Sequence, residues 1–243
     1  MIHHLARGLL LVALAGLIAR LLVTGQLALY MSPALNPLTG CTGVILAAMG
    51  AFELWSATRG GNAVDAGAHS AGLDEGLTYL LVLLPVGLGL LTVPRALDSA
   101  ALGGQDASRV VIAYSPIPVS GPVVPPAQPI EDIASLFKYL RTAGEGGVGQ
   151  PVHLVGMVAR GESLSDGQFV LLRYTIVHCV ADAQPIGLLV RTLPALSAST
   201  TNQWVEIDGT LASTDQGGSH LISVVATRVV PTDEPPDPYL QSV

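Results

Sequence analysis

Charged residues are scarce in this chain of 243 amino acids. Asp, Glu, Lys and Arg together make up 12% of the sequence, whereas about 25% is usual in soluble domains. Half of the residues are hydrophobic but only 5% are aromatic, so the apolar character comes mainly from leucine, valine and alanine. This composition predicts a protein that is partly embedded in a membrane.

Basic residues, cysteines and enzyme signatures are also few or missing. There are 11 Lys and Arg against 18 Asp and Glu, a net charge of -7, which argues against a nucleic-acid partner because phosphate binding needs basic residues. The only cysteines, Cys41 and Cys179, are too few for a disulfide framework. The sequence holds no Gly-x-Ser-x-Gly, no phosphate-binding Gly-rich Lys motif, no His-Glu-x-x-His and no Cys-x-x-Cys, so no enzymatic activity is expected.

Three long apolar runs dominate the first part of the chain, and each has about the ~20 residues that a helix needs to cross a membrane. The first run lacks a small-x-small cleavage site and is predicted to be a retained helix instead of a signal peptide. Arg7 and Arg59 would lie on one side of the membrane and Arg95 on the other, so the positive-inside rule places the C-terminal half outside the cytoplasm by two residues to one. The sequence therefore predicts a multi-pass protein of the cell membrane, with a membrane region over residues 1–97 in the lipid bilayer. Its predicted spans are residues 5–24, 38–55 and 77–94.

The second half has the composition of a linker followed by a soluble domain. Residues 98–128 are rich in Pro, Gly, Ala and Ser, as in extended linkers. Residues 129–243 are predicted to form the soluble domain, which opens with an amphipathic helix over Ile130–Leu140. The apolar residues of this helix recur at helical spacing: Ile130, Ile133, Leu136, Phe137 and Leu140.

Five strand-like runs follow this helix, separated by segments with glycine or other turn residues. Short strands at this spacing suggest a small barrel or sandwich, and five strands with a longer link between the third and fourth fit an OB-type Greek-key barrel. The predicted fold is thus a membrane α-helical N-terminal half plus an all-β, OB-like C-terminal barrel with one flanking helix. The five runs are residues 151–158, 169–177, 186–192, 204–212 and 220–230.

Side chains that can carry chemistry gather between the second and third runs, at His178, Cys179 and Asp182. Imidazole, thiolate and carboxylate are all zinc ligands, but a structural zinc site usually has four. His153 or His220 could supply the missing ligand, although the sequence does not place them nearby. The alternative to a metal or thiol site is a packed cysteine, a hydrogen-bonded histidine and an aspartate that caps the turn.

Arg173 stands in a strand that is otherwise apolar apart from threonine. Glu206 and Asp208 share one face of the fourth run by the period of two, so Arg173 could pair with either of them. The other interpretation is that Arg173 contacts an anion or a partner subunit.

The same stretch resembles the YcgQ-like family of bacterial permease subunits, membrane proteins with a soluble C-terminal domain. The family pattern is a strand with an arginine, then Cys-Cys-x-Ala-Asp-Ala, Gln-Pro and a second apolar strand. This chain departs from it at His178, where the family has its first cysteine. The residues that it keeps are Arg173, Cys179, Ala181, Asp182, Ala183, Gln184 and Pro185.

The resemblance implies an accessory subunit that works beside a separate multi-span permease, in the transport of a metal or another small solute. Arg173 and Gln184 are then the candidates for contact with the partner or solute. Two alternatives stay open. One is a membrane-anchored scaffold of the NfeD-like type, and the other is a metal- or thiol-handling protein that acts through His178 and Cys179.

Overall fold

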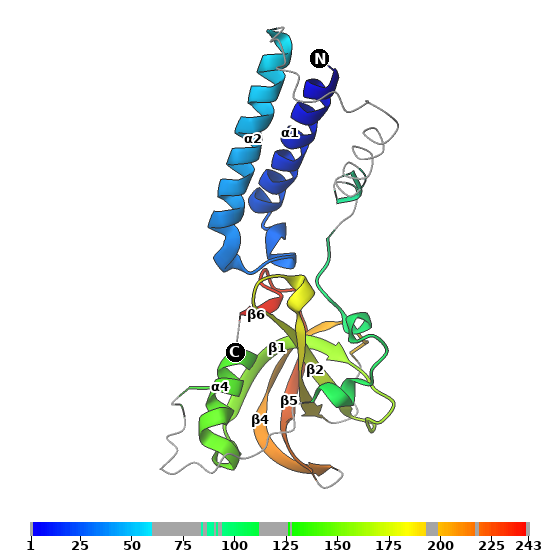
Figure 1. Ribbon diagram of the computed structural model, residues 1–243. Coiled ribbons are helices and arrows are strands. Elements are labelled where there is room, and N and C mark those ends of the chain that lie inside the picture. Colours follow the sequence, from blue (N-terminus) through cyan, green and yellow to red (C-terminus); the bar gives the residue numbers. More distant parts are fainter. Residues whose placement is uncertain are drawn as a thin grey trace. The chain divides into compact units, whose positions relative to one another are not determined.

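The computed structural model divides the chain into two compact units, residues 1–95 and residues 96–243 (Figure 1). The residues that the structure describes are 2–59, 84, 87–89, 91, 94–111, 126, 128–192, 199–216 and 219–241.

The first unit contains two long antiparallel helices, α1 (Ile2–Val23) and α2 (Asn36–Thr58), which are joined by the short 3-10 turns Gln26–Leu29 and Pro33–Leu35. By length and composition both helices could span a membrane, and they correspond to the first two predicted spans. The third predicted span lies mostly outside the described residues.

Glycine allows the two helices to approach closely. A Cβ atom at Gly50 of α2 would lie 2.9 Å from Val12 Cγ2 and 3.0 Å from the backbone oxygen of Gly8. Small residues at such contacts are typical of helices that associate in membranes. There the hydrophobic effect does not drive association, and small residues let the helices gain close van der Waals packing instead.

The second unit is a closed five-stranded barrel. Its strands run in the circuit β1-β2-β3-β5-β4-β1, in which all neighbours are antiparallel except the parallel pair β3–β5. A sixth strand, β6 (Tyr239–Gln241), pairs in parallel with β2 and was not predicted. All five predicted runs are confirmed as strands: β1 (Pro151–Ala159), β2 (Gln168–Ile176), β3 (Gln184–Arg191), β4 (Trp204–Gln216) and β5 (Ser219–Pro231).

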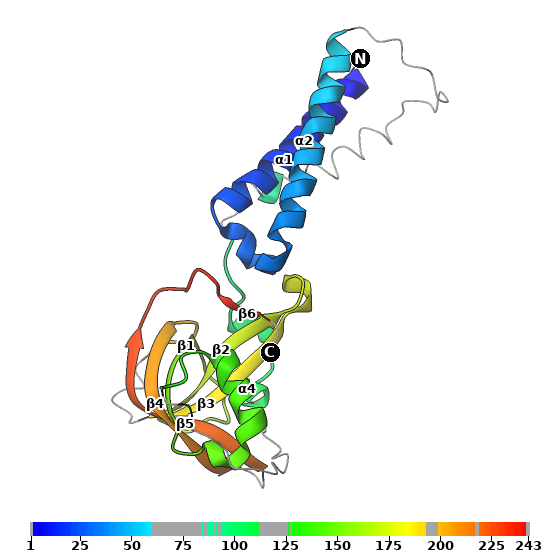
Figure 2. The same cartoon turned by 90° about the vertical axis from the view of Figure 1, so that its left-hand side faces the viewer.

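The predicted amphipathic helix is confirmed as α4 (Ile133–Ala143), which packs along the barrel (Figure 2). It begins three residues later than predicted, because Asp132 caps it by accepting a hydrogen bond from the Ser135 backbone N–H at 2.7 Å. Ile130 instead forms a β-bridge with Val152. The apolar face of α4 is buried in the main core together with the inward-facing residues of the barrel.

Residues 96–111, called the strap below, pack on the barrel and form part of the second unit. They bury Leu102 and Ala107 in a second apolar cluster with residues of β1 and β2, including Tyr174. The Tyr174 hydroxyl donates a hydrogen bond to the Asp98 backbone oxygen at 2.8 Å. Residues 98–128 were expected to form an extended linker. Residues 98–111 differ from that expectation, because they pack on the barrel. The rest of the predicted linker lies largely outside the described residues.

The buried hydroxyl of Tyr174 predicts an alkaline weakening of the barrel. Burial, with smaller contributions from Asp98 and Tyr239, raises the pKa of Tyr174 to about 12, whereas an exposed tyrosine has a pKa of about 10. Between these two pH values the folded state keeps a proton that the unfolded state has lost, so stability falls as the pH rises.

We expect the Tyr174→Phe variant to lose about 1 kcal/mol at neutral pH, because its hydrogen bond to the strap is removed. Its stability should then fall less steeply than that of the wild type between pH 10 and 12. Denaturant unfolding across this pH range measures both effects. If the stability of the two proteins falls equally with pH between 10 and 12, Tyr174 does not keep its proton in the folded state.

Candidate functional site

The turn between β2 and β3 holds the residues that stood out in the sequence. The Asp182 carboxylate accepts hydrogen bonds from the backbone N–H groups of Val177, His178 and Cys179, at 2.9, 2.9 and 3.2 Å. These bonds hold the pKa of Asp182 below its usual value, the bond from Val177 contributing most. Asp182 therefore acts as the turn cap that the sequence allowed as one alternative.

His178 and Cys179 lie beside this cap but do not build a three-ligand set with it. The His178 side chain is 73% exposed, and its Nδ1 lies 3.2 Å from Asp182 Oδ2. Cys179 is half-buried and carries a free thiol. Within the described residues, the three ligand atoms of this turn are not among those that come within 4.8 Å of one another. Metal binding by these three residues stays a prediction.

Arg173 is buried, with 8% of its surface exposed. Its Nη1 donates to the Val155 backbone oxygen at 3.3 Å, and its Nη2 donates to the Asp237 backbone oxygen at 2.9 Å. The guanidinium carbon lies 5.2 Å from the centroid of the Trp204 ring. Burial lowers the pKa of Arg173 to about 10, so the side chain stays cationic at neutral pH.

The predicted ion pair between Arg173 and Glu206 or Asp208 is wrong. Arg228 of β5 makes these contacts instead, because residue 228 lies directly opposite Asp208 in the β4–β5 register. Contact of Arg173 with a partner or solute stays a prediction. Gln184, the other predicted contact residue, is exposed at the start of β3.

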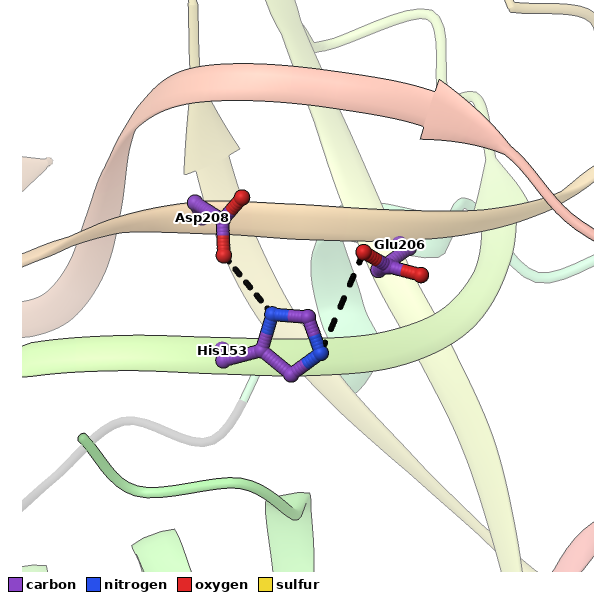
Figure 3. Close-up of side chains that lie close together, drawn as sticks. All are labelled: His153, Glu206 and Asp208. Atoms are coloured by element: carbon purple, nitrogen blue, oxygen red, sulfur yellow. Dashed lines mark hydrogen bonds and ion pairs between the residues drawn. The ribbon is translucent and has the colours of Figure 1, made fainter. Parts of the chain in front are cut away.

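A second cluster lies on the sheet formed by β1, β4 and β5 (Figure 3). His153 of β1 is directly opposite Asp208 of β4 in the antiparallel register, and Glu206 shares the face of Asp208 because side chains alternate along a strand. The distance from His153 Nδ1 to Asp208 Oδ1 is 2.7 Å, and the distance from His153 Nε2 to Glu206 Oε1 is 3.9 Å. One ligand atom from each residue lies within 4.8 Å of the other two.

Arg228 completes the charge balance of this cluster. Its Nη1 lies 3.1 Å from Glu206 Oε1 and 2.9 Å from Asp208 Oδ2. Hydrogen bonds from His153 and then Arg228 hold the pKa of Asp208 below its usual value, and the carboxylates in turn raise the pKa of Arg228. The shared face of Glu206 and Asp208 was visible in the sequence, whereas the approach of His153 depends on the pairing of β1 with β4.

The chain matches both domain models of one family. Residues 6–107 match the DUF1980 N-terminal domain and residues 131–241 match the DUF1980 C-terminal domain. Among known proteins, the UPF0703 protein YcgQ of Bacillus subtilis (strain 168) is 32% identical over 95 residues. The match covers 38% of this chain and about a third, 33%, of the length of that protein.

A crystal structure of a DUF3299 family protein from Pseudomonas aeruginosa PAO1 also aligns with the chain. The alignment covers 51% of this chain and 93% of the other, with 18% sequence identity and a TM-score of 0.27, a likeness too small to support a conclusion on fold or function. The N-terminal and C-terminal domain models match the chain in that order and together cover most of it. The chain belongs to the DUF1980 family of YcgQ-like proteins.

Proposed function

We propose that this protein is an accessory subunit of a bacterial membrane permease and works beside a separate multi-span permease in the cell membrane. The observation that carries the proposal is the start of the barrel unit at Ala96, directly after the third predicted span ends at Pro94. The Leu97 backbone N–H donates a hydrogen bond to the Tyr239 hydroxyl at 3.1 Å. The three peptide units from Pro94 to Leu97 reach at most about 11 Å. If residues 77–94 span the membrane as predicted, a domain joined to them by so few residues would act on a target in or at the same membrane.

The helix pair α1 and α2 supports a partner within the membrane. A groove of about 1040 Å³ runs between the two helices and is lined by apolar and small residues, among them Gly16, Gly40 and Gly43. A Cβ atom at Gly16 would meet nothing within 4 Å, so the groove is open at that point. Small residues let helices pack closely in lipid, and we assign the groove to one transmembrane helix of the permease.

The barrel contributes a compact domain to this assembly. A closed circuit of five strands with one parallel pair, β3–β5, supports the OB-type assignment made from the sequence. The basic residues Arg7 and Arg59 support a position of the barrel on the outer side of the membrane. On this proposal the barrel works as a protein-binding or solute-receiving domain and has no nucleic-acid partner.

Co-purification from native membranes tests the proposal. Full-length tagged protein, extracted in a mild detergent, should retain a multi-span permease. The Gly16→Leu variant fills the open part of the groove and should retain at least several-fold less permease. Leu9→Ala is the matched control, because Leu9 is exposed on α1 and does not line the groove.

Recovery of a stomatin-like scaffold in place of a permease would favour the structural adaptor and contradict the proposal. Recovery of neither partner would also contradict it. If Gly16→Leu and Leu9→Ala both retain the permease fully, the subunit role stands but the groove is not the docking site. In that case the third predicted span of this chain is the better occupant.

A further inference from the structure

We propose that His153, Glu206 and Asp208 form a binding site for a divalent transition metal of the zinc type, in which Arg228 takes the place of the metal ion when none is bound. The three ligand residues come from two neighbouring strands, and their positions are set by the barrel and not by a mobile loop. The inference concerns the barrel alone and does not depend on the permease role.

The ligand set fits such an ion in chemistry and in spacing. One imidazole nitrogen and two carboxylate oxygens suit zinc-type ions, whereas calcium and magnesium prefer oxygen ligands alone. Ligands about 2.0–2.2 Å from a shared tetrahedral zinc ion lie about 3.4 Å from one another. His153 Nδ1 lies 2.7 Å from Asp208 Oδ1, whereas the other ring nitrogen, Nε2, lies 3.9 Å from Glu206 Oε1, so the imidazole has to turn to offer one nitrogen to an ion shared with both carboxylates. One ligand atom from each residue lies within 4.8 Å of the other two, and each side chain is about a third exposed, so rotation of these side chains can bring one nitrogen and two oxygens around one ion.

The fourth position would be open to water or to a solute. Sites with three protein ligands and one exchangeable position are typical of zinc that is not purely structural. The side chains of His153, Glu206 and Asp208 are 38%, 30% and 37% exposed, so an ion can enter from solvent and leave again. We therefore expect reversible binding, without the near-permanent retention of a buried four-ligand site.

Arg228 is the feature that decides how the site works. Its Nη1 already contacts both carboxylates and balances part of the charge that a metal would balance. The Arg228 side chain is 53% exposed, and exposed ion pairs contribute little to stability, so the guanidinium can move into solvent when an ion arrives. Arg228 then competes with the metal, and removing it should strengthen metal binding.

This site differs from the turn at His178, Cys179 and Asp182. The Asp182 oxygens are already engaged by three backbone N–H groups, which makes Asp182 a poor ligand. The Glu206 and Asp208 carboxylates are instead held by Arg228, a half-exposed side chain that can rotate away. The geometry points to the strand cluster as the stronger of the two sites.

Zinc chloride titrated into the full-length protein in detergent at neutral pH, followed by calorimetry, tests the site. The wild type should bind about one zinc ion per chain. His153→Ala and Asp208→Asn should each weaken binding by about tenfold or more, whereas Arg228→Gln should strengthen it several-fold. His178→Ala and Cys179→Ser should bind as the wild type does. Magnesium at the same concentrations should give no heat of binding.

The opposite effects of neighbouring substitutions separate a metal site from a purely structural ion-pair cluster. If the cluster only stabilises the sheet, Arg228→Gln will not gain affinity for zinc, and the proposal fails. It also fails if neither the wild type nor Arg228→Gln binds zinc, or if binding is lost in Cys179→Ser instead of His153→Ala. Circular dichroism of each variant checks the fold, and Asp208→Asn, which keeps the side-chain volume, provides the test if His153→Ala does not fold.

Discussion

Replacing Gly209 with alanine is expected to destabilise the barrel by about 3 kcal/mol or more. Gly209 lies in β4 at the register shift that follows Asp208, where the strand faces Ala226 of β5. A Cβ atom at this position would lie 2.5 Å from the Val225 backbone oxygen and 2.7 Å from Val224 Cγ1. Because the nearest atom belongs to the backbone of the paired strand, it cannot move aside without loss of β4–β5 hydrogen bonds.

Chemical denaturation of the full-length protein in detergent, followed by the circular dichroism of the barrel, measures this effect. Gly103→Asn is the matched control, since Gly103 lies in the strap with a φ of +63° and open space around its Cα atom. Asparagine tolerates this left-handed conformation, so the change should stay within about 0.5 kcal/mol. A Gly209→Ala protein as stable as the wild type would mean that β4 and β5 do not approach each other as described.

The strands of the barrel could be predicted because their signal is local. Runs rich in Val, Ile and Leu, separated by turn residues, suit a pleated and buried surface whatever their partners are. β6 has only three residues, Tyr239–Gln241. It forms because β1 pairs with β2 at residues 170–172, which leaves residues 174–176 of β2 for parallel pairing with β6. Such a strand has no signal of its own in the sequence.

The strap was interpreted as a linker because its composition is that of a linker. Two aspartates make the difference: Asp98 and Asp106 each accept a hydrogen bond from the backbone N–H two residues on, at 2.9 and 2.8 Å, and so begin short 3-10 turns. These turns direct Leu102 and Ala107 into the second apolar cluster. The apolar contacts that stabilise the strap come from β1, β2 and β6, which are distant from it in the sequence.

In the candidate sites, too, only the features that depend on neighbouring residues could be predicted. Asp182 follows the turn rule for aspartate, which acts over a few residues, and the sequence allowed that role. The face shared by Glu206 and Asp208 also follows from local alternation. Which cation neutralises them depends on the β4–β5 register and its shift at Asp208, which no local pattern reveals. The sequence therefore predicts Arg173 as the partner of these carboxylates, whereas the structure has Arg228.

Arg173 is expected to hold the C-terminal segment on the barrel, and the Arg173→Ala variant should lose about 2–4 kcal/mol of stability. The substitution removes both hydrogen bonds, to Val155 and Asp237, and bonds from a charged donor contribute about 1.5–3 kcal/mol each before other losses are counted. It also leaves a void beside Trp204, whose lining loses packing contacts. The amides of β6 should then exchange with solvent faster, because the Asp237 anchor two residues before Tyr239 is lost.

Arg173→Met separates the charge from the packing. Methionine fills most of the volume of the arginine stem, and it removes a buried cation whose Nε has no hydrogen-bond partner among the described residues. Replacing a buried charge with an apolar side chain of similar volume is often close to neutral, so we expect this variant to lose only about 1 kcal/mol. Hydrogen exchange at residues 239–241 should still rise in Arg173→Met, since the bond to Asp237 is absent in both variants. If exchange at β6 is unchanged in both, the guanidinium does not anchor the segment, and its buried position has to be explained by packing on Trp204 alone.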